Sequence, residues 1–146
     1  MFQIDVANQQ SRLSVNKPRL RSAVKAVLEG EAIAQAQISV AVVDDETISR
    51  LNCQYLKQDH ATDVLSFLLE QDGDRLEGEV IVSGETAAAT AGRYGWSGED
   101  ELLLYVIHGA LHLAGYRDET RGEKLRMRRR ERAYLARFGL KPNRTQ

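Results

Sequence analysis

The sequence predicts one compact domain of mixed α and β structure, built around a buried helix over residues 98–114. Short segments have the residue patterns of strands, whereas longer ones repeat apolar residues at helical spacing. The chain has 146 residues, 42% of them hydrophobic and 28% charged, which is normal for one globular domain with a hydrophobic core. Residues 102–114 are apolar almost all round, which indicates a helix in the middle of that core.

Four strands are predicted, over residues 1–6, 38–43, 63–68 and 77–83. The first alternates apolar and polar residues, and the second is rich in β-branched residues. The last two are separated by a polar turn that contains Asp72 and Gly73, a dipeptide typical of tight hairpins. We therefore expect these two strands to pair antiparallel.

Five helices are predicted, over residues 17–29, 45–56, 84–94, 98–114 and 119–138. Short polar side chains at helix starts accept hydrogen bonds from the free N–H groups of the first turn. The residues placed to do so in the first four helices are Asn16, Asp44 or Asp45, Ser83 and Ser97. Gly139 is expected to end the last helix.

Two of the three histidines, His108 and His112, lie four residues apart within the predicted buried helix. Residues at this spacing share one helix face about 6 Å apart, so both imidazoles can reach a single metal ion. Gly115 suits the left-handed position that ends a helix, and the following turn can bring Asp118 to the same point. Two imidazoles and a carboxylate with one position left open are typical of a catalytic zinc site. The alternative is that both histidines are ordinary residues of an amphipathic helix.

Charge and cysteine content limit the function classes. The net charge is −1 at pH 7, so any surface for nucleic acid must be local. Cys53 is the single cysteine, which excludes an internal disulfide and is typical of a reducing cytoplasm. No segment approaches the ~20 apolar residues of a membrane span, and no signal-peptide pattern occurs. We expect a cytoplasmic protein with no membrane partner and no disulfide partner.

Further polar residues are candidates for catalysis or binding. Asp63 and Glu79 are candidate general bases if folding brings either near the metal, although Asp63 could instead fix its own loop. Five arginines occur within residues 126–132, including Arg128 and Arg129. They form either a solvated helix face or a patch that binds phosphates, because arginine forms paired hydrogen bonds with phosphate oxygens.

Three motifs in order resemble those of a known family. The run His108-Gly-Ala-Leu-His-Leu-Ala-Gly-Tyr116 is similar to H-G-x-L-H-L-x-G-Y-D-H, the signature of the YbeY family of bacterial rRNA maturation endoribonucleases. Leu51-Asn-x-x-Tyr55 with Asp59-x-x-Thr-Asp-Val-Leu-Ser-Phe67 also agrees, and Gly78-Glu-Val-Ile-Val-Ser83 resembles the family's G-D-I-x-I-S strand. Order and spacing agree over residues 38–135.

The resemblance implies a single α+β domain with a mixed four-stranded sheet, against which the metal helix packs. It also implies a single-strand-specific, metal-dependent endoribonuclease that matures ribosomal RNA, notably the 3′ end of 16S rRNA, and takes part in ribosome quality control. Its partners would be ribosomal RNA and the small ribosomal subunit. Its cofactor would be one Zn²⁺ per chain, held by His108, His112 and Asp118.

The chain departs from the family pattern at two places. Asp118 stands where the family usually has histidine, and Arg117 replaces the preceding aspartate; a carboxylate oxygen is still an acceptable zinc ligand. In the family's Y-R-x-K-D pattern, Leu56 and Gln58 replace the arginine and the lysine. We expect Lys57 or Arg117 to supply the missing charge, so these residues join Arg128 and Arg129 as candidates for binding RNA phosphates.

Two alternatives belong to other function classes. A zinc peptidase-like hydrolase has the same histidine spacing, but such enzymes place a glutamate after the first histidine as general base, where this chain has Gly109. A ribosome-associated protein with a structural metal would need four protein ligands. Only Cys53 and His60 remain as fourth ligands, and His60 alone is more typical of an exposed or hydrogen-bonded histidine.

Overall fold

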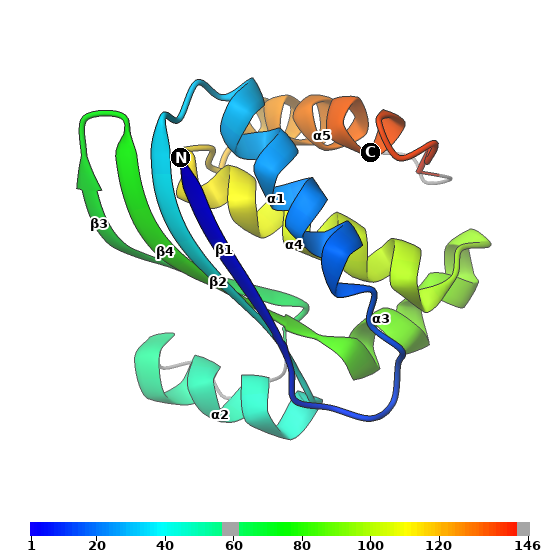
Figure 1. The fold of residues 1–146 in the computed structure, drawn as a ribbon. Coiled ribbons are helices and arrows are strands. Elements are labelled where there is room, and N and C mark those ends of the chain that lie inside the picture. The colour runs from blue at the N-terminus through cyan, green and yellow to red at the C-terminus, as the bar shows by residue number, and fades with distance from the viewer. Residues whose placement is uncertain (57–61, 143–146) are drawn as a thin grey trace.

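The computed structural model describes residues 1–56 and 62–142, with the side chain of Leu56 outside the description. This part of the chain forms one α+β domain with a four-stranded mixed sheet and five α-helices (Figure 1). The elements in order are β1 (Phe2–Asn8), α1 (Lys17–Gly30), β2 (Gln35–Val43), α2 (Asp45–Leu56), β3 (Val64–Asp72), β4 (Arg75–Ser83), α3 (Gly84–Ala91), the 3-10 helix η1 (Gly92–Tyr94), α4 (Gly98–Leu113) and α5 (Arg121–Ala136).

The sheet has the strand order β1-β2-β4-β3. Strand β2 pairs parallel with both β1 and β4, and β3 pairs antiparallel with β4, as the Asp-Gly turn predicts. This hairpin is longer than predicted, because β3 continues to Asp72 and β4 begins at Arg75. Its outer part is polar and exposed, so residues 69–74 lack the apolar alternation that indicates a strand.

The helices begin at the predicted caps. Asp44, rather than Asp45, caps α2, with its Oδ1 2.8 Å from the N of Thr47. The side chains that accept at the starts of α1, α3 and α4 are Asn16, Ser83 and Ser97. Two helices are shorter than predicted: the segment 84–94 becomes 3-10 after Ala91, and α5 begins only after Thr120, in a capping box with Glu123.

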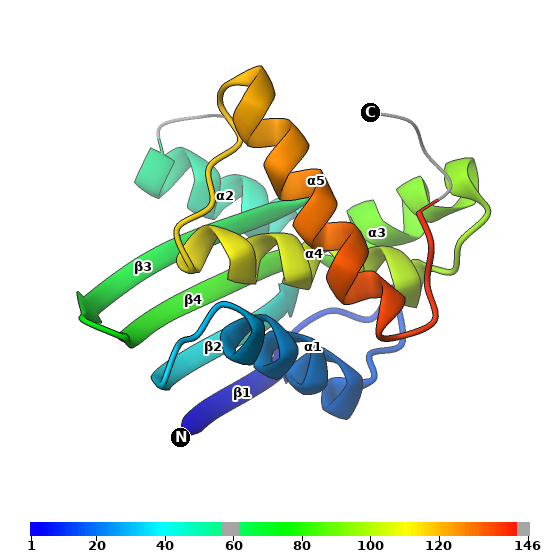
Figure 2. The same ribbon diagram turned by 90° about the horizontal axis from the view of Figure 1, so that it is seen from above.

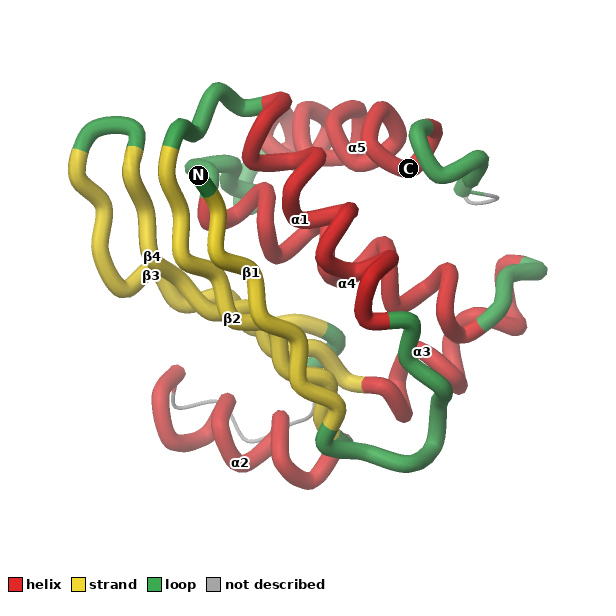
Figure 3. Tube along the Cα trace, viewed as in Figure 1, coloured by secondary structure: helices red, strands yellow, loops and turns green. Residues whose placement is uncertain are grey.

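The helices cover the two faces of the sheet unequally. Helices α1 and α4 pack on one face and share the main hydrophobic core, whereas α2 lies on the other face with a small core around Ile48, Leu65 and Ile81 (Figures 1 and 3). Helix α5 crosses α4 on the side away from the sheet (Figure 2). Because α4 lies between the sheet and α5, eleven of its sixteen residues are buried. None of the described helices is long and apolar enough to cross a membrane.

Helix α4 approaches the sheet most closely at Gly109. A Cβ at this position would lie 2.5 Å from Cγ1 of Val80 on β4 and 3.1 Å from Oγ of Ser66 on β3. The Ser66 hydroxyl donates a hydrogen bond of 3.1 Å to the Gly109 carbonyl. The missing side chain therefore allows the helix to sit directly on the sheet, while the side chains of His108 and His112 stay partly exposed.

Candidate metal centre

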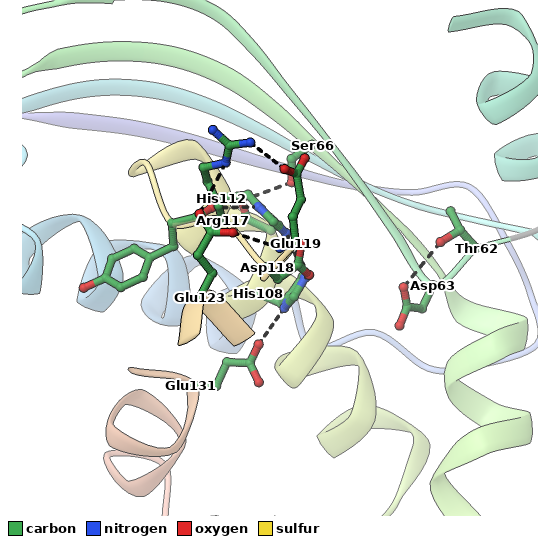
Figure 4. Close-up of polar contacts among 12 residues, drawn as sticks. Thr62, Asp63, Ser66, His108, His112, Arg117, Asp118, Glu119, Glu123 and Glu131 are labelled. Atoms are coloured by element: carbon green, nitrogen blue, oxygen red, sulfur yellow. Dashed lines mark hydrogen bonds and ion pairs between the residues drawn. The ribbon is translucent and has the colours of Figure 1, made fainter. Parts of the chain in front are cut away.

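Three potential ligands converge at the C-terminal end of α4. Nε2 of His108 and Nε2 of His112 are 3.0 Å apart. The Oδ2 atom of Asp118, in the loop after α4, lies 3.4 Å from the first nitrogen and 3.5 Å from the second (Figure 4). Among the described residues, these three form the group of His, Cys, Asp or Glu side chains that could hold a metal ion. The sequence-based prediction of their proximity is confirmed.

Hydrogen bonds on the far side of each ring fix how the imidazoles point. Nδ1 of His108 donates to Oε2 of Glu131 on α5 at 2.5 Å, and Nδ1 of His112 donates to the carbonyl of Tyr116 at 2.9 Å. A carbonyl only accepts, and so does an ionised carboxylate, so both Nδ1 atoms carry a hydrogen. Both Nε2 lone pairs are thereby directed at the shared point, the arrangement that metal-binding histidines generally adopt.

The geometry of the group fits a metal ion. Two lone pairs that face each other at 3.0 Å repel unless a cation or a proton lies between them. Two nitrogen ligands about 2.1 Å from one zinc ion, at the tetrahedral angle, lie about 3.4 Å apart. The observed separation is close to that value, so a small adjustment of the side chains accommodates the ion.

Burial and charge act differently on the two histidines. Burial lowers the pKa of His108, but the hydrogen bond and charge of Glu131, with the charges of Asp118 and Asp63, raise this pKa overall. Burial and the neighbouring His108 lower the pKa of His112. His108 is thus surrounded by negative charges that favour its protonated form, whereas His112 favours its neutral form.

The loop that carries Asp118 is held at several points. Gly115 has φ +108°, a backbone conformation that side chains rarely allow, and its N–H donates to the His112 carbonyl. The Tyr116 hydroxyl donates to Oε1 of Glu31 at the end of α1, 2.9 Å away. The other oxygen of Glu31 accepts from Arg130 and Tyr134 on α5. Burial raises the pKa of Glu31, but these three hydrogen-bond donors lower it overall, so the carboxylate stays ionised.

A groove of about 1250 Å³ opens beside the metal centre. His108, Asp118 and Glu131 are among its lining residues. The remaining lining residues come from the start of β3, from η1, α4 and α5, and from the segment after α5: Asp63, Val64, Arg93, Tyr94, Leu104, Tyr105, Arg128, Arg132, Ala136, Leu140, Lys141 and Pro142. His108 and Asp118, two of the three potential ligands, therefore border this groove.

Comparisons with known proteins identify the family of this chain. A family profile described as Endoribonuclease YbeY matches residues 5–139. The chain is 37% identical to Endoribonuclease YbeY of Moorella thermoacetica, with 96% of this chain and 99% of that protein aligned. It is 40% identical to Endoribonuclease YbeY of Desulfitobacterium hafniense, with 80% of each chain aligned. The chain belongs to the YbeY endoribonuclease family.

The fold comparison points the same way. The solution structure of a Thermotoga maritima protein is 27% identical and has a TM-score of 0.61, with 100% of this chain and 97% of that one covered. The YbeY relatives make this protein an enzyme of the nuclease class. The sequence-based recognition of the family and of the fold class is confirmed.

Of the two candidate bases, only Asp63 lies near the metal centre of this YbeY family member. Asp63 lines the groove together with His108, beside the cluster rather than within it (Figure 4). Glu79 is placed elsewhere: Val80 and Val82 of β4 belong to the core under α4, whereas Ile81 belongs to the core under α2. Because successive side chains of a strand alternate between faces, Glu79 lies on the α2 face with the sheet between it and the metal centre.

The predicted phosphate-binding residues have different positions. Arg128 lines the groove, and its Nη1 lies 3.6 Å from Oε1 of Glu131. Arg129 is exposed on α5 and is not part of the groove lining. Arg117 is exposed and its guanidinium contacts the carboxylates of Glu119 and Glu123, at 2.5 and 3.6 Å.

The remaining residues predicted to bind RNA or metal lie outside the described residues or away from the ligand group. Lys57, Gln58 and His60 lie outside the described residues, as does the side chain of Leu56. Cys53 is exposed on α2, across the sheet from the histidines, and is not part of the ligand group. A structural site closed by Cys53 is therefore not formed.

Sequence reasoning missed Glu131, the hydrogen-bond partner of His108. A signal for it exists: Glu131 lies four residues after Met127 and four before Leu135, both buried. An acidic residue at this spacing falls on the buried face of an amphipathic helix, where it needs a specific partner. The side chain of Glu131 is only 5% exposed. Arg93 and Lys141 were also missed, because nothing local in the sequence marks them as members of the same groove as Arg132, which belongs to the predicted arginine run.

Proposed function

We propose that this protein is a zinc-dependent endoribonuclease that cuts single-stranded ribosomal RNA, including the 3′ end of 16S rRNA during maturation. In this proposal it works in the cytoplasm on the small ribosomal subunit and takes part in ribosome quality control. Membership of the YbeY endoribonuclease family supports the choice of RNA as substrate. The single observation that carries the proposal is the group of two Nε2 atoms and one carboxylate oxygen, two members of which, His108 and Asp118, line the groove.

The residues of the metal centre divide into metal ligands, residues that orient the ligands, and a proton acceptor. His108, His112 and Asp118 would hold one metal ion, and nitrogen and oxygen donors of this kind suit zinc. Zinc supplies Lewis acidity, which polarises the phosphoryl group of the substrate. Glu131 and the Tyr116 carbonyl keep both imidazoles in the tautomer whose Nε2 is free to bind. Asp63 lines the same groove and is the candidate to accept a proton from the attacking water.

The groove favours a single strand over a duplex. Its lining includes arginine side chains for the phosphates, and apolar side chains such as Leu104, Leu140 and Pro142 offer surface to unstacked bases. Sequence-tolerant binding of single strands combines such cationic and apolar surfaces. Arg128 is the groove cation that also contacts Glu131, so it is placed to meet a phosphate near the metal centre.

The peptidase alternative is disfavoured by the packing at Gly109. A glutamate at this position, as in zinc peptidases, would have its Cβ 2.5 Å from Val80 and would point into the sheet. This fold therefore has no place for that general base. The structural-metal alternative is disfavoured because the ligand group opens onto the groove and has three members among the described residues.

Replacement of Asp118 by Asn, with Glu119→Gln as a matched control, tests the proposal. Both residues are acidic and belong to the same loop, but only Asp118 belongs to the ligand group. We expect wild-type protein to contain about one zinc per chain and to cut single-stranded but not double-stranded RNA. Asp118→Asn should lose zinc and cleavage, and Glu119→Gln should keep both. A zinc-loaded wild-type protein that does not cut RNA would overturn the nuclease proposal.

A further inference from the structure

The groove is longer than the metal centre requires. Its volume of about 1250 Å³ exceeds the range of small-molecule sites, about 300–1000 Å³. Along α5 it extends from Glu131, which contacts His108, to Ala136, a distance of about 7.5 Å at 1.5 Å per residue. Beyond α5 it includes Lys141. This length corresponds to roughly two or more stacked nucleotides of about 3.4 Å each, so a bound strand would extend past the scissile phosphate.

Both acidic and basic side chains line this groove. The acidic ones are Asp63, Asp118 and Glu131, and Glu131 also faces Arg128. The other cations that line the groove are Arg93 of η1, Arg132 of α5 and Lys141 of the following segment. These three, which we call the cationic rim, come from segments up to 48 residues apart in sequence (141 − 93), so their meeting is a property of the fold.

Among the residues that the structure describes, no side chain is paired with the cationic rim. Within residues 1–56 and 62–142, neither Arg93, Arg132 nor Lys141 makes a salt bridge or a side-chain hydrogen bond. Other arginines of the same surface are paired: Arg117 with Glu119, and Arg130 with Glu31. Since the net charge of the chain is −1, three cations without a side-chain partner in the lining of one groove are a local exception. Unpaired cations of this kind attract an anionic ligand.

We propose that Arg93, Arg132 and Lys141 form a phosphate-binding subsite that holds the RNA backbone outside the metal centre. This inference rests on the proposed function for the identity of the strand, but the subsite itself recognises only consecutive phosphates. The apolar lining at Leu140 and Pro142 lies beside the rim, where bases of the same strand can pack. The subsite would contribute affinity and orientation, whereas the metal centre performs the cut.

The test is a triple variant, Arg93→Gln, Arg132→Gln and Lys141→Gln. All three side chains are exposed, so the variant should fold, which circular dichroism checks. The matched control is Lys17→Gln, Arg21→Gln and Lys25→Gln, which removes the same charge from an exposed face of α1 that does not line the groove. The ligand is a 12-nucleotide single-stranded DNA, which presents consecutive phosphates but is not a substrate for a ribonuclease. Its dissociation constant is measured by fluorescence anisotropy at several KCl concentrations.

We expect the rim variant to bind this strand about tenfold more weakly than wild type at 0.1 M KCl, and the control to stay within about twofold. Each lost phosphate contact lowers the slope of log K against log salt by about 0.7, so three lost contacts lower it by about 2. Equal losses in both triple variants would overturn the subsite, because general charge would then explain them. Wild-type protein that does not bind the strand would also overturn it.

The binding result and the cleavage result can fail separately. If the rim variant loses DNA affinity but wild-type protein does not cut RNA, the subsite stands and the proposed nuclease function fails. If wild-type protein cuts RNA and the rim variant cuts a 12-nucleotide RNA with unchanged KM, the function stands and the subsite fails. The pattern expected if both are right is a raised KM with kcat within about twofold of wild type, since the rim does not touch the reacting atoms.

Discussion

The metal centre and the cationic rim of the groove are built in opposite ways. At the metal centre, both imidazoles are held: His108 by Glu131, and His112 by the Tyr116 carbonyl, with Tyr116 in turn held by Glu31. In the cationic rim, Arg93, Arg132 and Lys141 are exposed and have no side-chain partner within the described residues. Hydrogen bonds are thus concentrated at the metal centre, where atoms must be positioned. The charges of the cationic rim are unpaired, and there only attraction is required.

This difference has a physical reason. Metal ligands must keep their positions within fractions of an ångström, and their supporting hydrogen bonds are worth about 10–100-fold in metal affinity. Phosphate attraction tolerates mobile side chains because the Coulomb energy changes slowly with distance. Variants at the metal centre should therefore change metal binding and stability. Single variants at exposed cations should change these properties and RNA affinity only slightly.

Glu131→Gln should have the largest effect of the variants proposed for this comparison. The amide keeps the size of the side chain but removes the charge that orients His108 and raises its pKa. We expect zinc affinity to fall by about 10–100-fold with the fold retained. Competition with a chelating dye measures this affinity.

Arg128→Gln is the companion of that variant. It removes the other contact of Glu131, at 3.6 Å, while the bond to His108 stays. We expect zinc affinity to change by less than about threefold. A similar loss in both variants would show that Glu131 acts through general electrostatics and not through its hydrogen bond to the ring.

Gly109→Ala should have the next largest effect, on stability. The new Cβ would lie 2.5 Å from Val80, so α4 must move away from the sheet. Such overpacking costs about 1–3 kcal/mol of unfolding free energy. Urea denaturation measures the loss, and Gly122→Ala, where a Cβ meets nothing within 4 Å, is the control that should not be destabilised. An unchanged midpoint for Gly109→Ala would contradict the close packing of α4 on the sheet.

How far the sequence predicts these features depends on how local they are. His108, His112 and Asp118 lie within eleven residues, so helix geometry and one glycine bend suffice to predict their meeting. Glu131 comes from another helix, and only its position between Met127 and Leu135 hints that it is buried. The predicted pairing of the hairpin is confirmed, but its length is not, because its tip is exposed and lacks an apolar pattern.

Local spacing could not predict the site residues whose positions depend on which sheet face a helix covers or on how distant segments meet. Alternation shows that Glu79 and Val80 face opposite sides, but it does not show which side carries α4. The cationic rim depends on how η1 and the end of α5 meet, which no local spacing encodes. The family motifs predicted the domain and the ligand group. The other residues around the site could be identified only from the folded structure.

Glu31→Gln should show a smaller, pH-dependent effect. The folded-state pKa of Glu31 lies below its ordinary value of 4.5, because the bonds from Tyr134, Arg130 and Tyr116 outweigh the effect of burial. A lowered pKa stabilises the fold above about pH 4.5, and this contribution is lost as the pH falls through the folded-state value. The variant should therefore be about 1–3 kcal/mol less stable than wild type at pH 7.

The difference between wild type and Glu31→Gln should shrink as the pH falls below about 4.5. Thermal unfolding from pH 7 to pH 3 measures it, with Glu29→Gln, an exposed acid on the same helix, as control. Zinc affinity should also fall a fewfold, because the variant weakens the hydrogen bond that holds Tyr116, whose carbonyl in turn orients His112. A constant difference at all pH values would mean that the amide disturbs packing and that the charge of Glu31 is not what holds the loop.

Arg117→Ala should have the smallest effect, although Arg117 stands beside Asp118 and is a sequence-based candidate for binding phosphate. Its guanidinium contacts Glu119 and Glu123, so its charge is already neutralised, unlike that of the cationic rim. We expect the dissociation constant for a 12-nucleotide single strand to stay within about twofold of wild type. The double variant Glu119→Gln and Glu123→Gln would free Arg117 and should tighten binding. A loss of tenfold or more in Arg117→Ala would show instead that Arg117 leaves its carboxylates to meet the strand, and proximity to the metal would then matter more than the absence of a partner.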